Sequence, residues 1–261
     1  MYNFIVQAYS TYRGLFQWLN WAGYLSNVVF RPIAIMMMYS ILGRFAGNPA
    51  EVQSYVLGVA AYSMVLIIVP SITQSYTNDR GYGTLAFFYA SPASRFINFC
   101  SRITFHYPNA LISFTASLIT ASLLVHMDFS LVNWGAFILS IVLTGASIAA
   151  FGQFLGIFAI ILRDWGNVQT ISTGLLLILT GVIIPVTVFP AALQELVKLL
   201  PMANGLIAIR EVFLGATLSE VAVSVAREII TGLVYFGIAY FGFVTFERVA
   251  KKRGTLEIEA F

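Results

Sequence analysis

The sequence has little charge and a single cysteine. Only 10% of its 261 residues are Asp, Glu, Lys or Arg, whereas 59% are hydrophobic. A typical soluble domain has about 25% charged residues, so a soluble globule of this composition would lack the polar surface needed to cover its core. The single cysteine, Cys100, has no second thiol with which to form a disulfide or a metal site. An ordinary soluble domain and a disulfide-stabilised domain are therefore both excluded.

Sequence signatures of enzymes and of ion-driven transporters are also missing. No stretch matches G-x-x-x-x-G-K-[ST], the loop that cradles nucleotide phosphates. His106 and His126 are too far apart in the sequence to form a metal site, and the few basic residues are scattered, which argues against a nucleic-acid partner. Ion-coupled transporters keep carboxylates in mid-membrane, but here only Glu228 lies within a long apolar segment. We therefore expect no catalytic, cofactor or metal site in this chain.

Long uncharged runs account for the apolar excess. Crossing a bilayer takes about 20 apolar residues in a helix, and residues 52–78, 103–127, 129–162, 165–194 and 229–246 contain no Asp, Glu, Lys or Arg. With one further span near the N-terminus, we predict an all-α membrane protein of six transmembrane helices. The expected spans are residues 24–45, 52–76, 102–125, 132–162, 168–188 and 226–246.

Four segments outside these spans have distinct characters. Residues 1–21 have apolar side chains at helical spacing and two tryptophans near the end, which predicts an interfacial amphipathic helix. Residues 77–101 form a loop with a short apolar helix in it. Residues 190–215 predict two short helices separated by Pro201, too short to cross the membrane, and therefore a re-entrant or interfacial hairpin. Residues 247–261 form a tail, and the whole chain, 1–261, is one membrane domain.

The distribution of basic residues predicts the orientation. If the N-terminus is inside, nine basic residues face the cytoplasm and four face outward, with Arg31 left aside. Cytoplasmic loops carry the excess of Lys and Arg, so both termini are expected in the cytoplasm.

Arg31 lies within the first span, followed by Pro32. An arginine near the bilayer centre costs about 2.5–3.5 kcal/mol on insertion scales. Two interpretations remain open: the side chain snorkels to the cytoplasmic headgroups, or it lines a polar cavity used by a substrate.

The order of these parts resembles the membrane subunit of a type-2 ABC exporter, the ABC-2 permease family. Two stretches carry the resemblance. Residues 79–85 read DRGYGTL and lead to SPAS at 91–94, similar to the family's cytoplasmic loop. Residues 180–186 read TGVIIPV and precede Phe189-Pro190 and Leu200-Pro201, similar to its fifth span and extracellular hairpin.

The resemblance implies that the loop docks into a groove on a separate ATPase subunit, which binds the ATP and Mg. By this resemblance, Asp79 and Arg80 make polar contacts with the ATPase, and a short run of apolar residues after them anchors the loop in the groove. The implied turn residues are Gly83 and Thr84, the implied anchors Leu85, Phe87 and Phe88, and the motif ends at Ser91 and Pro92. A loop helix that merely rests on lipid is the alternative. Arg163 and Asp164 form either a second, supporting contact or a helix-capping ion pair.

The resemblance also implies a dimer of permeases, as a homodimer or a paralogue heterodimer, working with two ATPases in a plasma membrane that we expect to be bacterial. Gly181, Pro185, Pro190 and Pro201 would break the fifth helix and close the outer end, the alternative being simple loop packing. The expected function is export of an amphipathic drug, natural product, peptide or lipid-linked molecule. Alternatives are export of a polysaccharide or teichoic-acid-like polymer and a non-transporting scaffold.

Overall fold

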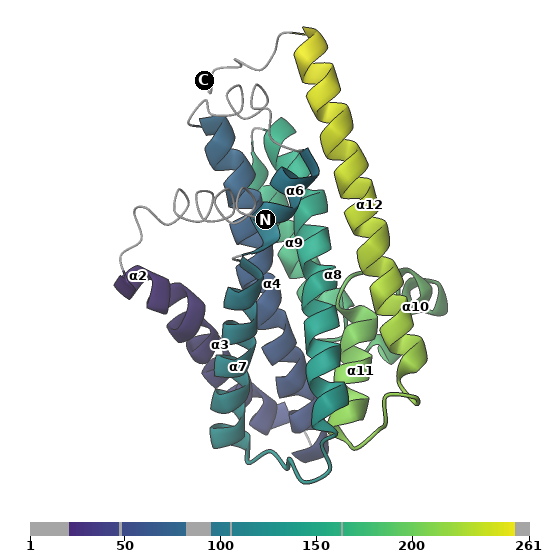
Figure 1. Ribbon diagram of the computed structural model, residues 1–261. Helices are drawn as coiled ribbons and strands as arrows, with labels where there is room; N and C mark the ends of the chain where they lie inside the picture. The colour runs from purple at the N-terminus through teal and green to yellow at the C-terminus, as the bar shows by residue number, and fades with distance from the viewer. Residues whose placement is uncertain (1–20, 47–48, 82–94, 105, 163, 254–261) are drawn as a thin grey trace.

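A computed structural model describes residues 21–46, 49–81, 95–104, 106–162 and 164–253. Within these ranges the regular structure is helical (Figure 1). The elements are α2 (Trp21–Leu25), the π-turn η1 (Ser26–Phe30), α3 (Arg31–Ala46), α4 (Pro49–Gly81), α6 (Arg95–Thr104), α7 (His106–Val125), α8 (Trp134–Ile161), α9 (Trp165–Leu179), the 3-10 turn η2 (Val186–Val188), α10 (Ala191–Val197), α11 (Ala203–Phe213) and α12 (Ala222–Arg253).

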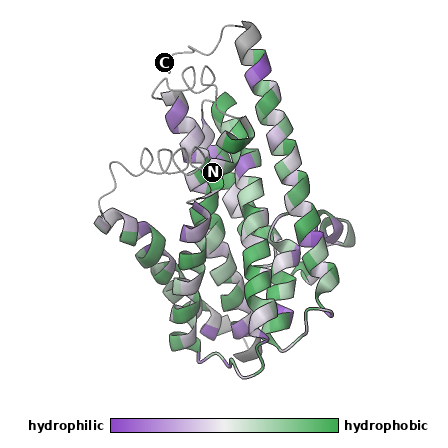
Figure 2. Ribbon diagram, viewed as in Figure 1, coloured by the Kyte–Doolittle hydropathy of each residue, from purple (hydrophilic) through white to green (hydrophobic). Residues whose placement is uncertain are grey.

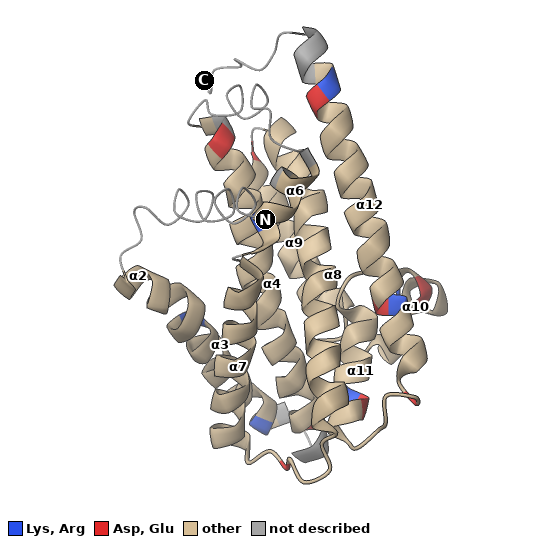
Figure 3. Cartoon of the chain, viewed as in Figure 1, with Lys and Arg blue, Asp and Glu red and all other residues tan. Residues whose placement is uncertain are grey.

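Five helical segments of the described chain are long and apolar enough to cross a membrane: Trp21–Phe45, Glu51–Asp79, Phe99–Val125, Trp134–Ile161 and Ala222–Val249. Hydrophobic residues, drawn green, predominate along these segments (Figure 2), and charged residues are few and concentrated toward the helix ends (Figure 3). The five segments correspond to the expected first, second, third, fourth and sixth spans. The all-α, multi-pass membrane class is therefore confirmed.

The fifth expected span differs from the prediction. Hydropathy placed the fifth span at residues 168–188, whereas α9 ends at Leu179 and has 15 residues. At about 1.5 Å per residue it is roughly 22 Å long, shorter than a hydrocarbon core of about 30 Å. Gly181 then adopts φ +85°, which ends the helix. The prediction was wrong here because the apolar run continues past the turn, through Val182 to Ile184, although the helix does not.

Other boundaries also shift. The expected loop at 77–101 is shorter at both ends, because α4 continues to Gly81 and α6 begins at Arg95. The expected tail at 247–261 begins as helix, because α12 runs to Arg253. The hairpin at 190–215 does contain two short helices, α10 and α11. The expected interfacial helix at 1–21 lies outside the described residues except for Trp21, which opens α2.

The bundle is built around α4 and α8. In the most apolar part of each span, 83% of the α4 residues and 67% of the α8 residues are buried, against 22% for the first and last spans. α8 packs between α4 and α12, while α7 packs on α4 and α3 packs on α7 (Figure 1). We call the end where α4 stops and α6 starts the loop end. The opposite end, where α7 connects to α8 and α11 to α12, is the hairpin end.

Glycines let the central helices approach closely. A Cβ added at Gly152 of α8 would lie 3.2 Å from Cδ1 of Ile72 on α4, and one at Gly145 would lie 2.9 Å from the Tyr107 ring on α7. Helices in membranes associate through such small residues because lipid provides no hydrophobic driving force between them. The packing of α8 against α4 and α7 therefore depends on side-chain size at single positions.

The closest of these approaches joins α11 to α8 and gives a testable prediction. A Cβ at Gly205 would overlap the side chain of Thr144 on α8. Gly205→Ala is therefore expected to destabilise the protein by about 1–3 kcal/mol through overpacking. Gly174→Ala is the control, because no atom lies within 4 Å of a Cβ there. Thermal unfolding in detergent should show a lowered midpoint for Gly205→Ala alone; equal midpoints would contradict this packing.

Candidate functional site

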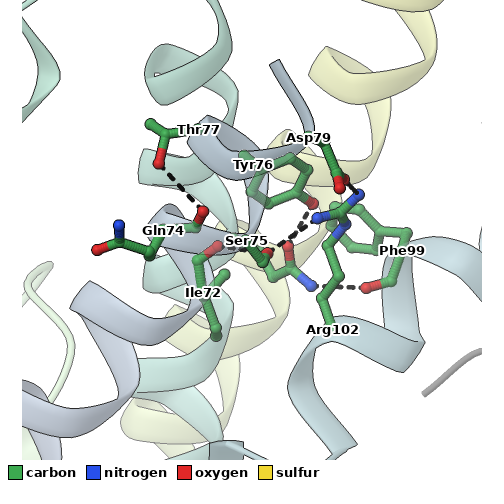
Figure 4. Close-up of polar contacts among 9 residues, drawn as sticks. Ile72, Gln74, Ser75, Tyr76, Thr77, Asp79, Phe99 and Arg102 are labelled. Carbon is green, nitrogen blue, oxygen red and sulfur yellow. Dashed lines mark hydrogen bonds and ion pairs between the residues drawn. The ribbon is translucent and has the colours of Figure 1, made fainter. Parts of the chain in front are cut away.

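A buried arginine joins the two helices that flank residues 82–94. Arg102 of α6 forms an ion pair with Asp79 near the end of α4, and its Nη1 donates to Ser75 Oγ at 2.9 Å (Figure 4). The Arg102 side chain is 1% exposed and that of Asp79 is 24% exposed. The ion pair therefore joins α4 directly to α6, the two helices on either side of residues 82–94.

The same arginine connects these two helices to α8. Its guanidinium carbon lies 4.1 Å from the centroid of the Tyr76 ring, within cation–π range. Tyr76 donates from its hydroxyl to Gln153 Oε1 at 2.6 Å, and Gln153 Nε2 donates to the Phe99 carbonyl at 2.6 Å (Figure 4). Tyr76, Gln153 and Phe99 are all fully buried. A continuous set of polar contacts therefore runs from α4 through α6 to α8.

The Phe99 ring extends the contact to α12. It packs against Phe236, Tyr240 and Phe243, with ring centroids 5.3, 5.7 and 5.8 Å away. We refer to the residues that carry these contacts as the loop-base cluster, namely Ser75, Tyr76, Asp79, Phe99, Arg102 and Gln153. The cluster couples both flanks of residues 82–94 to α8 and α12.

The structure describes only some of the residues that were predicted to contact the ATPase. Asp79, expected to contact a partner, has its carboxylate on Arg102 within the chain, and Arg80 is the penultimate residue of α4. Asp164 precedes α9 and accepts a hydrogen bond from Asn167 Nδ2 at 2.7 Å. The other predicted loop residues lie outside the described residues: Gly83, Thr84, Leu85, Phe87, Phe88, Ser91, Pro92 and Arg163.

At the hairpin end, Arg210 ties α11 to two other elements. Its Nε donates to the Ser54 carbonyl of α4 at 3.0 Å, and its Nη2 donates to the Gly181 carbonyl at 2.9 Å. Gly58 makes room for it, since a Cβ there would lie 2.8 Å from Nη2. Arg210 thus holds the turn after α9 against the first turns of α4.

Glu228 of α12 caps the start of α11. Its two carboxylate oxygens accept the N–H groups of Met202 at 2.7 Å and Gly205 at 2.9 Å, and the residue is 1% exposed. The first N–H groups of a helix have no partner within the helix and carry partial positive charge, so a carboxylate stabilises them. Glu228 is therefore a buried helix cap, which explains why this carboxylate is tolerated in an apolar span.

The four predicted gate residues border the short helices of the hairpin end. Gly181 forms the positive-φ turn after α9, Pro185 directly precedes η2, and Pro190 is the N-cap of α10. Pro201 is buried in the turn before α11. They set the boundaries of these elements, while Arg210 and Glu228 supply the polar contacts that fix α11.

Exposed carboxylates outside the spans serve as local caps. The backbone N–H of Ser130 lowers the pKa of Asp128, and that of Thr217 lowers the pKa of Glu220. The hydrogen bond from Lys198 lowers the pKa of Glu195. Among the described residues, no group of three or more His, Cys, Asp or Glu side chains could hold a metal ion.

Arg31 differs from the other two arginines described above. Its side chain is exposed at the start of α3, directly after the π-turn, while the adjacent Pro32 is buried. Sequence reasoning singled out Arg31 but missed the roles of Arg102, Arg210 and Glu228. The available signal was a charge, or in the case of Gln153 an amide, within a mostly apolar stretch of sequence.

Comparison with known proteins identifies the family. No curated protein matches the chain. A family model described as "ABC-2 type transporter" matches residues 9–214, which is most of the chain and includes the loop-base cluster and Arg210. Permeases of this family are transport subunits and are generally not catalytic themselves. With five candidate membrane spans and a match that covers more than half of its length, the chain belongs to the ABC-2 type transporter family of membrane permeases.

Proposed function

We propose that this chain is the membrane-spanning subunit of an ATP-driven exporter whose separate ATPase subunit docks on residues 82–94. The observation that carries the proposal is the loop-base cluster. Asp79 and Arg102 join the two flanks of the loop, and Tyr76 and Gln153 connect them to α8. A displacement of the loop by a docked partner is therefore passed to the centre of the bundle.

The motor and the second half of the path come from other chains. ATP and Mg bind the ATPase, and the sequence of this chain contains no G-x-x-x-x-G-K-[ST] stretch that would bind a nucleotide itself. Two permease copies, identical or paralogous, form the path between them in the plasma membrane of a bacterium, with both termini in the cytoplasm. Support comes from the family and from the excess of basic residues on the predicted cytoplasmic side.

The hairpin of α10 and α11 is the proposed outer gate. α11 is buried against α8 and α12 and is held by Arg210 on one side and Glu228 on the other. Gly181 and the three prolines give the short breaks that such a gate needs. Rotation of α12 or α4 would displace the hairpin, because each of these helices supplies one of its polar contacts.

The transported molecule is an amphipathic compound such as a drug, natural product, peptide or lipid-linked molecule. A polymer substrate, or a scaffold function without transport, would appear as a failure of the transport assay described at the end of the Discussion.

The docking assignment predicts a specific loss of the complex. Leu85→Asp or Phe88→Asp places a carboxylate on the surface that would enter the ATPase groove, where a desolvated, unpaired charge is costly. Each variant is expected to weaken ATPase binding at least about tenfold, measured by co-purification at graded ATPase concentrations. Leu214→Asp, at an exposed apolar position of the hairpin end, is the matched control. Retention of the complex by both loop variants would overturn the assignment.

A further inference from the structure

Arg31 lies deep within the first span and has an exposed side chain. It follows Trp21 by ten residues in a 25-residue apolar segment. At about 1.5 Å per residue this is about 15 Å from the start, half of a hydrocarbon core of about 30 Å. No described residue forms a hydrogen bond or an ion pair with its guanidinium. A charge within a span normally faces a protein partner or a polar cavity, and among the described residues no acidic side chain pairs with Arg31.

A local widening of the helix places two more polar residues beside Arg31. The Arg31 N–H donates to the Ser26 carbonyl across the π-turn, and Pro32 explains the widening because it has no N–H and its ring crowds the preceding turn. Ser26 and Asn27 are also exposed and lie one turn before Arg31. We call Ser26, Asn27 and Arg31 the polar patch. Such π-turns within helices occur frequently at functional sites.

The patch is exposed, and its Arg31 charge lies within electrostatic range of Tyr62 on α4. The opposite side of the helix is anchored, because Tyr24 donates from its hydroxyl to Asn109 Oδ1 on α7 at 2.7 Å, and Val28 and Met36 are buried. Beyond the patch, the exposed positions of α3 are apolar up to Arg44: Met37, Met38, Ile41 and Leu42. One surface of the first span thus presents a cationic group followed by an apolar strip.

This surface matches an amphipathic anion, with the head at the patch and the apolar part along the strip. We propose that Ser26, Asn27 and Arg31 bind the phosphate or carboxylate head of an amphipathic substrate. The guanidinium supplies charge and a planar set of donors suited to these groups, and the Ser26 hydroxyl and Asn27 amide add neutral donors. The inference rests on the proposed export function and specifies its substrate class as anionic amphiphiles.

Arg44 provides a matched control. It is exposed on the same helix, α3, but lies in the last turn, near the end of the span. An arginine there is close enough to the headgroups to snorkel, whereas Arg31 lies about 20 Å farther from that end of the helix at about 1.5 Å per residue. If any exposed arginine on α3 were enough to bind anions, the two positions would behave alike.

The test is binding of a fluorescent dodecyl phosphate to the purified full chain in phosphatidylcholine nanodiscs. Arg31→Gln is expected to weaken binding at least about tenfold, because a charge-assisted contact is lost. Arg44→Gln should leave the dissociation constant unchanged, Arg31→Lys should bind at an intermediate level, and a fluorescent dodecanol should bind all variants equally. Equal binding of dodecyl phosphate by Arg31→Gln and the wild type, or equal losses at both arginines, would overturn the proposal. Unchanged thermal unfolding of Arg31→Gln shows that the loss is not misfolding.

An anionic lipid headgroup has the same chemistry as the head of an anionic substrate. A second experiment therefore distinguishes a lipid ligand from a substrate. The measurement is repeated in phosphatidylglycerol nanodiscs. Dodecyl phosphate should bind the wild type as before if the patch selects a substrate. A weakened affinity that requires Arg31 would show that a lipid headgroup occupies the patch, and would overturn the substrate assignment. The assay contains no ATPase, so a failure of the proposed docking is observed separately, in the co-purification experiment.

Discussion

Asp79→Leu is expected to lower the free energy of unfolding by about 3–5 kcal/mol, the usual cost of removing one partner of a buried ion pair. Arg102 would keep its charge at a site where its side chain is 1% exposed. Arg102→Met should cost less, because the Asp79 side chain is 24% exposed and water can solvate it. The measurement is thermal or denaturant unfolding of the purified protein in detergent.

The double variant Asp79→Leu/Arg102→Met makes this test decisive. Replacing a buried ion pair by apolar residues of similar size is often neutral or stabilising, so the double variant should be more stable than Asp79→Leu alone. If the two losses simply add, the ion pair does not couple α4 to α6, and the loop-base cluster is not the unit described here. A folded double variant also distinguishes the effect of the ion pair on folding from its effect on coupling to the ATPase. It should still bind the ATPase but stimulate ATP hydrolysis less than the wild type.

Glu228→Leu is expected to have the second large effect, a loss of about 3–5 kcal/mol. Two buried N–H groups, of Met202 and Gly205, would lose their acceptors, and each unsatisfied buried donor costs about 1–3 kcal/mol. Glu228→Gln keeps one carbonyl oxygen as an acceptor and should lose less. Hydrogen exchange at the first turn of α11 reports the effect directly, because the uncapped turn should exchange faster than in the wild type.

Glu220 is the control for this experiment. Its carboxylate also accepts a backbone N–H, that of Thr217 at 2.7 Å, but the residue is exposed. Glu220→Gln should change stability far less than Glu228→Gln, since water replaces the lost contact. Equal effects at the two positions would mean that burial does not strengthen the Glu228 cap.

Sequence reasoning was most successful for the long helices. An uninterrupted apolar run of more than 20 residues forms a spanning helix in a membrane, because every backbone polar group must be hydrogen-bonded within the segment. For this reason α4 and α8 were predicted with small boundary errors. Hydropathy overestimated the length of the fifth span, because Val182 to Ile184 are as apolar as α9 before them, and only the family resemblance indicated a break at Gly181. The break is a backbone property of Gly181, whose φ of +85° is favourable only for glycine.

The functional residues show a second limit of prediction from the sequence, which concerns their contacts. Arg102, Arg210 and Glu228 were visible as rare charges in apolar surroundings, but their partners lie 23 to 156 residues away in the sequence. Spacing rules connect residues within one helix turn and do not connect Arg102 with Asp79 across a loop. The sequence therefore predicted which residues are unusual, and the tertiary structure was needed to show what each one contacts.

The central claim is that this permease moves a substrate only when an ATPase partner drives it. The most direct measurement places the chain in proteoliposomes with the ABC ATPase from a neighbouring reading frame and follows a labelled amphipathic anion across the membrane. Transport should require ATP, both proteins and an intact P-loop lysine in the ATPase, and it should fall with Phe88→Asp. Equal movement of the anion with and without ATP, or an ATP hydrolysis rate that the permease leaves unchanged, would contradict the account.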